Sequence, residues 1–231
     1  MVNEGILPRA ALRQVEARLT EAGCPDADFD AAELFRLAVG ADARLATAPL
    51  TAAQAAQLEA LTARRADREP LQYLCGSWPF LDFELAVGPG VLCPRADTEV
   101  VAEAAAQMLA GVQAPKVLDL CAGTGCLGLG VKRFCPEADV TCVEKSPEAF
   151  RYLKKNVVLA LKQGTARAVE GDLFHYWQGL PGAVKYQPVL PGFQRHGRFP
   201  GHLGLQLLHL GGGEVGRVGH DEVQLPLRQA L

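Results

Sequence analysis

Three acidic residues and one glycine-rich turn are the groups in this chain best placed to do chemistry. The turn, Gly123-Thr124-Gly125, follows an apolar run at residues 117–120 that predicts a short buried strand. Residues 127–134 after the turn predict a helix. This order brings a helix N-terminus and free backbone N–H groups to a bound nucleotide. With Gly128 the turn also satisfies G-x-G-x-x-G, but that pattern alone also describes glycine turns that bind nothing.

The three acids are Asp119, Glu144 and Asp172, and each accompanies a predicted strand. Asp119 lies in the strand before the turn, Glu144 ends the apolar run at residues 140–143, and Asp172 ends a short strand within residues 166–174. The carboxyl ends of parallel strands meet at one edge of a sheet, so we expect the three acids to line one crevice. Any one of them taken alone is better read as a solvated loop acid, and it is the three at matching strand ends that favour a site.

The positions of these acids favour one ligand chemistry over another. An acid at the position of Glu144 would hold the ribose hydroxyls of a nucleotide. In a dinucleotide-binding strand the apolar residues run straight into the first glycine, whereas Asp119 suits an amino-bearing or cationic ligand such as the methionine part of S-adenosylmethionine. Asp172 could accept a hydrogen bond from the adenine amino group. A dinucleotide oxidoreductase is therefore the less favoured alternative.

Composition narrows the class of protein. The chain has 231 residues and a net charge of −3, so it lacks the basic footprint of a protein that binds nucleic acid directly. No apolar run reaches the roughly 20 residues that span a bilayer. The seven cysteines include no C-x-x-C pair, which indicates reduced thiols in a cytoplasmic protein and predicts no metal site.

The elements around the turn are predicted from local patterns. Residues 8–66 read as helices, with Thr51 and Gln54 forming a capping box. Residues 76–91 predict a hairpin that joins this helical part to the rest through few contacts. Asp97 or Thr98 is expected to cap a helix that ends at Met108. An ion pair with Glu99 or with a neighbouring acid is the expected role of Arg95.

Several segments together resemble one known family. They are PLQYLCGSWPF, VLCPRADTE, VLDLCAGTGCLGLG, VEKSPEAFRYLKKN and EGDLF, within residues 70–174. They resemble the HemK-like, S-adenosylmethionine-dependent methyltransferases that modify the glutamine amide nitrogen in the Gly-Gly-Gln loop of peptide chain release factors. The resemblance implies an α/β fold: a small all-helical domain (residues 1–70), a β-hairpin linker (71–96) and a Rossmann-like methyltransferase domain (97–182).

The resemblance also implies roles for individual residues. The turn residues would wrap the methionine and ribose part of S-adenosylmethionine, Glu144 would hold the ribose hydroxyls, and the adenine would lie between two flanking residues. The turn residues are Cys121, Ala122, Gly123, Thr124 and Gly125, and the cofactor-binding set also includes Asp119 before them. The two residues that would flank the adenine are Asp172 and Leu173. A release factor is the implied protein partner of a monomeric enzyme.

The chain departs from the family after about residue 182. The family's Asn-Pro-Pro-Tyr loop, which positions the substrate amide, is missing, because the only asparagines are Asn3 and Asn156 and neither precedes proline. Gln187-Pro188 is the nearest string, so no catalytic residue is assigned. No lysine follows Lys185, and histidines stand at 196, 202, 209 and 220.

This change in composition predicts that residues 183–231 form an aberrant tail, which a shifted reading frame would explain better than a divergent natural C-terminus. We then expect an incomplete sheet with unpaired strands and little or no methyl transfer. The alternative function is a non-catalytic remnant that binds the cofactor or docks a release factor.

Overall fold

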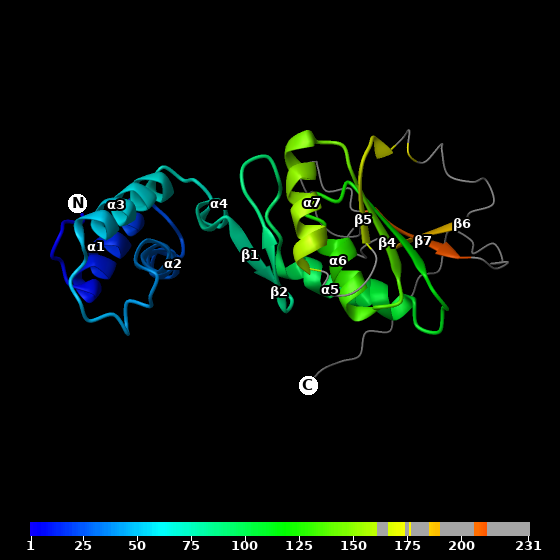
Figure 1. Ribbon diagram of the computed structural model, residues 1–231, viewed down its shortest axis with the longest axis horizontal. Helices are drawn as coiled ribbons and strands as arrows, with labels where there is room; N and C mark the ends of the chain where they lie inside the picture. The colour runs from blue at the N-terminus through cyan, green and yellow to red at the C-terminus, as the bar shows by residue number, and fades with distance from the viewer. Residues whose placement is uncertain (161–165, 174–175, 177–184, 190–205, 212–231) are drawn as a thin grey trace.

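The computed structural model describes residues 1–160, 166–173, 176, 185–189 and 206–211, which form a helical lobe, a hairpin and an α/β part (Figure 1). The helices are α1 (Pro8–Glu21), α2 (Ala27–Val39), α3 (Ala52–Ala66), α4 (Leu71–Cys75), α5 (Ala96–Met108), α6 (Cys126–Phe134) and α7 (Pro147–Ala160). The strands are β1 (Ser77–Phe80), β2 (Phe83–Ala86), β3 (Lys116–Leu120), β4 (Asp139–Glu144), β5 (Ala166–Glu170), β6 (Lys185–Val189) and β7 (Gln206–Gly211). Over these described residues, no helix is both long and apolar enough to cross a membrane.

The helices of the lobe begin and end where local chemistry favours it. α1 begins at Pro8, where a missing backbone N–H costs nothing. α2 ends at Val39 and is followed by Gly40, whose φ of 79° is easy for a residue without a Cβ. The predicted capping box of α3 is confirmed: the Gln54 N–H donates to the Thr51 hydroxyl at 3.3 Å, and the Thr51 N–H donates to Gln54 Oε1 at 3.0 Å.

The lobe has a hydrophobic core of its own. Leu19, Leu34 and Leu58 from three different helices are fully buried in it. At its edge Arg65 Nε donates to Asp30 Oδ2 at 2.7 Å, and only 13% and 5% of the two side chains are exposed. A pair so well buried must stay paired, because one charge left alone there would be strongly destabilising.

The hairpin belongs with the α/β part. β1 and β2 pair antiparallel from Ser77 opposite Ala86 to Phe80 opposite Phe83. Phe80 and Leu85 are buried in one cluster with Leu129 of α6. The apolar face of the hairpin therefore packs on α6, and the expectation of few contacts between the lobe and the α/β part across this connector stays a prediction.

α5 begins without the predicted cap. Its N-cap position is Arg95, and no side chain there bonds to the first turn, so a cap at Asp97 or Thr98 is wrong. Asp97 instead lies inside the first turn, where a negative charge is favourable. Glu99 also differs from expectation. Its Oε1 accepts from the Leu81 N–H at 2.8 Å, and among the described residues no ion pair joins it to Arg95.

The central sheet has the strand order β5-β4-β3-β7-β6, and its first three strands are parallel. Alternate residues of β3 face opposite sides, as the twofold side-chain period requires. Val117 lies in the cluster shared with α5, α6 and α7, whereas Leu118 and Leu120 lie in a second cluster with Val143. The predicted fold class, a partial Rossmann-like methyltransferase fold behind a helical region, is confirmed.

Two strands of the tail join this sheet. β7 pairs antiparallel with β3, from Lys116 opposite Leu210 to Leu120 opposite Gln206, and β6 pairs antiparallel with β7. The expectation that the tail leaves strands unpaired is therefore wrong for the edge of β3. Gln187 lies in β6, whereas the histidines at 196, 202 and 220 lie outside the described residues.

The separate core of the lobe leads to a prediction. Leu34→Ala should cost about 2–5 kcal/mol, because it empties a fully buried site. Limited proteolysis of this variant should degrade the helical lobe while a fragment from the hairpin onward stays protected. Leu45→Ala is the matched control, since Leu45 is 81% exposed in the same lobe. Loss of both fragments at the same rate would contradict an independently stable lobe.

Candidate functional site

The turn between β3 and α6 is built from left-handed backbone. Cys121, Gly123 and Gly125 have φ values of 60°, 57° and 80°. Glycine adopts this region at no cost, whereas a side chain at Cys121 is held there against a small steric penalty. The Ala122 N–H donates to the Val143 carbonyl at 3.0 Å, which fastens the turn to β4.

The three glycines of the motif have different roles. A Cβ at Gly125 would lie 2.6 Å from Leu153 Cδ1, and one at Gly128 would lie 2.7 Å from Cys142 Sγ. These two positions therefore permit close packing of α6. A Cβ at Gly123 would meet only Val91 Cγ2, at 3.8 Å, so this position requires glycine for its backbone and leaves room beside it.

Glu144 is oriented by backbone donors on both sides. Its Oε2 accepts from the Gly123 N–H and its Oε1 accepts from the Ser146 N–H, each at 2.8 Å. These bonds hold the carboxylate at the carboxyl end of β4, directly against the glycine turn. Each oxygen retains acceptor capacity for a further donor, since a carboxylate oxygen can accept two hydrogen bonds.

Asp119 lies beneath the turn rather than in an open crevice. It is 1% exposed, and its Oδ2 accepts from the Gly128 N–H at 2.9 Å. Its Oδ1 is buried without a hydrogen-bond partner among the described residues. Burial raises the pKa of this carboxyl to about 7, the Gly128 bond opposes that rise, and the charge of Glu144 adds to it.

The third acid, Asp172, follows the end of β5 and pairs with Lys145 Nζ at 2.8 Å. Leu173 packs beside the apolar cluster of Leu118, Leu120 and Val143. The charges of all three acids act on the exposed thiol of Cys121. Partial desolvation is the main cause of its raised pKa, followed by the charges of Glu144, Asp119 and Asp172.

The predicted site residues therefore gather at one edge of the sheet. Because Leu120 lies opposite Val143 and Glu144 opposite Glu170, the three parallel strands end together. The turn and Glu144 are in direct contact, Asp172 and Leu173 lie at the next strand, and Asp119 is enclosed below them. This arrangement offers backbone donors, two acids and an apolar neighbour to a ligand.

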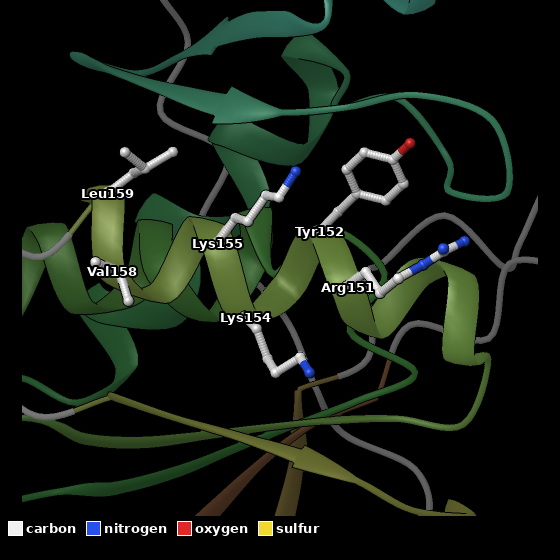
Figure 2. Close-up of a pocket in the computed structure, with 6 residues that line it drawn as sticks. All are labelled: Arg151, Tyr152, Lys154, Lys155, Val158 and Leu159. Carbon is white, nitrogen blue, oxygen red and sulfur yellow. The ribbon is translucent and has the colours of Figure 1, made fainter.

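An open groove of about 780 Å³ lies along α7, lined by Arg151, Tyr152, Lys154, Lys155, Val158 and Leu159. Figure 2 shows Tyr152 and Lys155 on the side of α7 toward the hairpin and Lys154 on the opposite side. None of the lining residues belongs to the predicted site, and none is an acid. We therefore place the chemistry at the turn and not in this groove.

Sequence reasoning missed Asn156. Its side chain is completely buried and bonds to backbone groups of Ala86 and Thr124, so it contacts both the hairpin and the turn. A signal was available in the chain, since Asn156 continues the apolar stripe of Phe150 and Leu153 along α7. A polar residue on a buried helical face must find partners there.

The burial of Asp119 gives a testable pH dependence. Its pKa is raised on folding, so the stability linked to its protonated form is complete below about pH 4 and is lost as the pH rises through about 7. Asp119→Asn should therefore gain roughly 2–3 kcal/mol relative to the parent chain between pH 5 and pH 8. Chemical denaturation at both pH values measures this gain. Asp67→Asn, at an exposed acid, should show no such trend, and a pH-independent effect of Asp119→Asn would refute the argument.

Comparison with known proteins gives this geometry a context. The PrmC N-terminal domain matches residues 10–76, and the TRM5/TYW2 methyltransferase domain matches residues 99–182. The second match ends where the composition of the chain changes.

Curated relatives match across both parts. The release factor glutamine methyltransferase of Bifidobacterium longum is 39% identical over 155 residues, which are 63% of this chain and 53% of the relative. Those of Deinococcus radiodurans and Geobacter sulfurreducens are each 36% identical, over 81% and 72% of this chain and 68% and 58% of their own lengths. The chain thus spans about half to two thirds of the relatives it matches. The helical lobe comes first in the chain and the sheet with its glycine turn follows, in the same order as the two matched domains. The chain belongs to the release factor glutamine methyltransferase family.

Proposed function

We propose that the turn at residues 121–125 binds S-adenosylmethionine and that Glu144 is the main anchor for its ribose. The orientation of the Glu144 carboxylate carries this proposal. Two backbone N–H groups, from Gly123 and Ser146, hold it against the turn, and both oxygens can still accept. Such a preorganised carboxylate suits a pair of neighbouring hydroxyls, because charge-assisted hydrogen bonds are the strong ones.

The buried carboxylate of Asp119 supports the methionine end of the same ligand. Its Oδ1 lacks a partner among the described residues, and an unsatisfied buried oxygen is costly. An ammonium group at the turn would favour the ionised form of this acid. The match between a cationic ligand and a buried acid is what distinguishes this site from one for a dinucleotide.

The remaining contacts suit the adenine end. Leu173 packs on the apolar cluster of the sheet, and Asp172 lies one residue before it with a carboxylate that can accept from an exocyclic amino group. Lys145 pairs with that carboxylate at 2.8 Å. In this proposal the Asp172 carboxylate either bonds to Lys145 and the adenine amino group together or exchanges Lys145 for the adenine when the cofactor binds.

The transferred group would be the sulfonium methyl that S-adenosylmethionine supplies, and the acceptor would be a glutamine amide in the Gly-Gly-Gln loop of a release factor. The names of the relatives support this acceptor. An amide nitrogen is a weak nucleophile, so the transfer depends on carbonyl acceptors that hold the NH₂ group in line. This chain contains no Asn-Pro-Pro-Tyr to provide them, and we propose that it binds the cofactor without efficient transfer.

Glu144→Gln tests the cofactor site. The substitution keeps one acceptor for the backbone but removes the charge, so binding of S-adenosylmethionine should weaken by about 1.5–3 kcal/mol. Isothermal titration calorimetry measures the loss. Glu170→Gln is the matched control, because Glu170 is an exposed acid that lies opposite Glu144 in the sheet. Equal affinity of Glu144→Gln and the parent chain would show that Glu144 does not bind the cofactor. Tighter binding of NAD than of S-adenosylmethionine would show that the cofactor is wrongly identified.

Methyl transfer is tested separately. The purified chain, tritiated cofactor and a release factor should give labelling close to background, since lost positioning can remove about 7–11 kcal/mol of barrier lowering. Cofactor binding measured on the same sample separates an inactive site from an unfolded one. Strong labelling of the release factor glutamine would overturn the proposal of inactivity and would make Gln187 the first residue to substitute.

A further inference from the structure

Asn156 forms a closed set of hydrogen bonds between two segments that are distant in the sequence. Its Oδ1 accepts from the Ala86 N–H at 2.6 Å, and its Nδ2 donates to the Ala86 carbonyl at 3.0 Å and to the Thr124 carbonyl at 2.9 Å. Ala86 is the last residue of the hairpin strand β2, and Thr124 lies in the centre of the glycine turn. One buried side chain thus ties the end of the hairpin to the cofactor turn.

The segment that follows β2 makes further contacts with the same turn. Val91, which is 4% exposed, is the nearest neighbour that a Cβ at Gly123 would meet. The carbonyl of Val91 accepts from the Tyr73 hydroxyl at 2.6 Å, and Tyr73 belongs to α4 at the end of the helical lobe. Hydrogen bonds and packing therefore run from the lobe through the hairpin to the glycine turn.

The chemistry of the contact requires an amide. Both hydrogens of Nδ2 are used by carbonyl groups, and Oδ1 is used by an N–H, so donors and acceptors match on both sides. An aspartate of the same shape would place an oxygen against two carbonyl oxygens. A leucine would leave the N–H and carbonyl of Ala86 and the buried carbonyl of Thr124 without this partner, which is costly.

We propose that Asn156 is a positioning residue that holds the glycine turn in register with the hairpin, so that the hairpin and the cofactor site move as one unit. For the cofactor itself this rests on the proposed function; the link between hairpin and turn does not. A protein partner that displaces the hairpin would then change the turn, and a ligand at the turn would resist that displacement.

Asn156 is easily observed in the parent protein. The chain has only two asparagines, so selective ¹⁵N labelling of asparagine gives two side-chain amide signals, and the exposed Asn3 is the internal reference. The Asn156 amide protons should exchange with solvent much more slowly than those of Asn3. Addition of S-adenosylmethionine should shift the Asn156 signals and leave those of Asn3 in place. Equal exchange of the two amides would overturn the proposal without any substitution.

Two variants separate positioning from general stability. Asn156→Asp should speed amide hydrogen exchange in the peptide that covers residues 122–127 and weaken S-adenosylmethionine binding, each by about tenfold or more. Val157→Ala is the matched control, since Val157 is the next residue of α7 and packs in the core without bonding to the turn. At equal global stability it should leave exchange in residues 122–127 within about twofold of the parent chain.

The outcomes distinguish the two proposals. If the parent chain does not bind S-adenosylmethionine, the proposed function fails, but faster exchange in Asn156→Asp still supports the positioning role. If exchange in the turn changes equally in Asn156→Asp and Val157→Ala, Asn156 is an ordinary core residue and the inference fails. If Asn156→Asp does not fold, the exchange rates of the Asn156 and Asn3 side-chain amides in the parent chain test the proposal, and equal rates would overturn it.

Discussion

The site depends on holding a left-handed turn in place at the end of β3. Within the turn the Gly125 N–H donates to the Ala122 carbonyl at 2.7 Å, and neighbouring elements must satisfy the other backbone groups. The Ala122 N–H bonds to β4, the Gly123 N–H bonds to Glu144, and the Thr124 carbonyl bonds to Asn156. Because these partners come from β4 and α7, the turn acquires its shape only when the sheet and its covering helices are assembled. The same bonds that build the turn also orient Glu144 toward it.

The buried acid beneath the turn, Asp119, adds an energetic cost to this arrangement. Asp119 anchors the first turn of α6 through Gly128, yet one of its oxygens is left buried without a partner among the described residues. Its raised pKa expresses the cost of ionising there. Binding sites often carry such a cost, since an uncompensated group in the free protein favours the ligand that compensates it. Gly128 is needed because a side chain would collide with Cys142 and Asp119.

The cofactor half and the acceptor half of the proposed reaction differ in how fully this chain provides them. Residues up to 173 supply the turn, the oriented carboxylate and the apolar neighbour. β3 pairs with β4 on one side and with the antiparallel β7 on the other. The strand end of β7 that lies beside the turn is therefore its N-terminal end, at Gln206. A parallel neighbour would deliver its following loop to the same edge as Glu144, whereas an antiparallel one delivers its N-terminal end there. The strand direction is therefore consistent with a site that binds a cofactor without holding an acceptor amide.

Local patterns in the sequence by themselves determined the helical lobe, the α3 capping box, the strand–turn–helix order and the position of Glu144, because each depends on residues close together in the chain. The tertiary structure alone decided which groups are buried and which hydrogen-bond partners they find. Asp97 reads as a cap until the helix is seen to begin before it, and the packing of the hairpin's apolar face on Leu129 is set only in the folded chain. Likewise, the burial of Asp119 and the three bonds of Asn156 depend on elements far apart in sequence. Spacing predicts which side chains share a face, but desolvation and hydrogen-bond partners are set by what packs against that face.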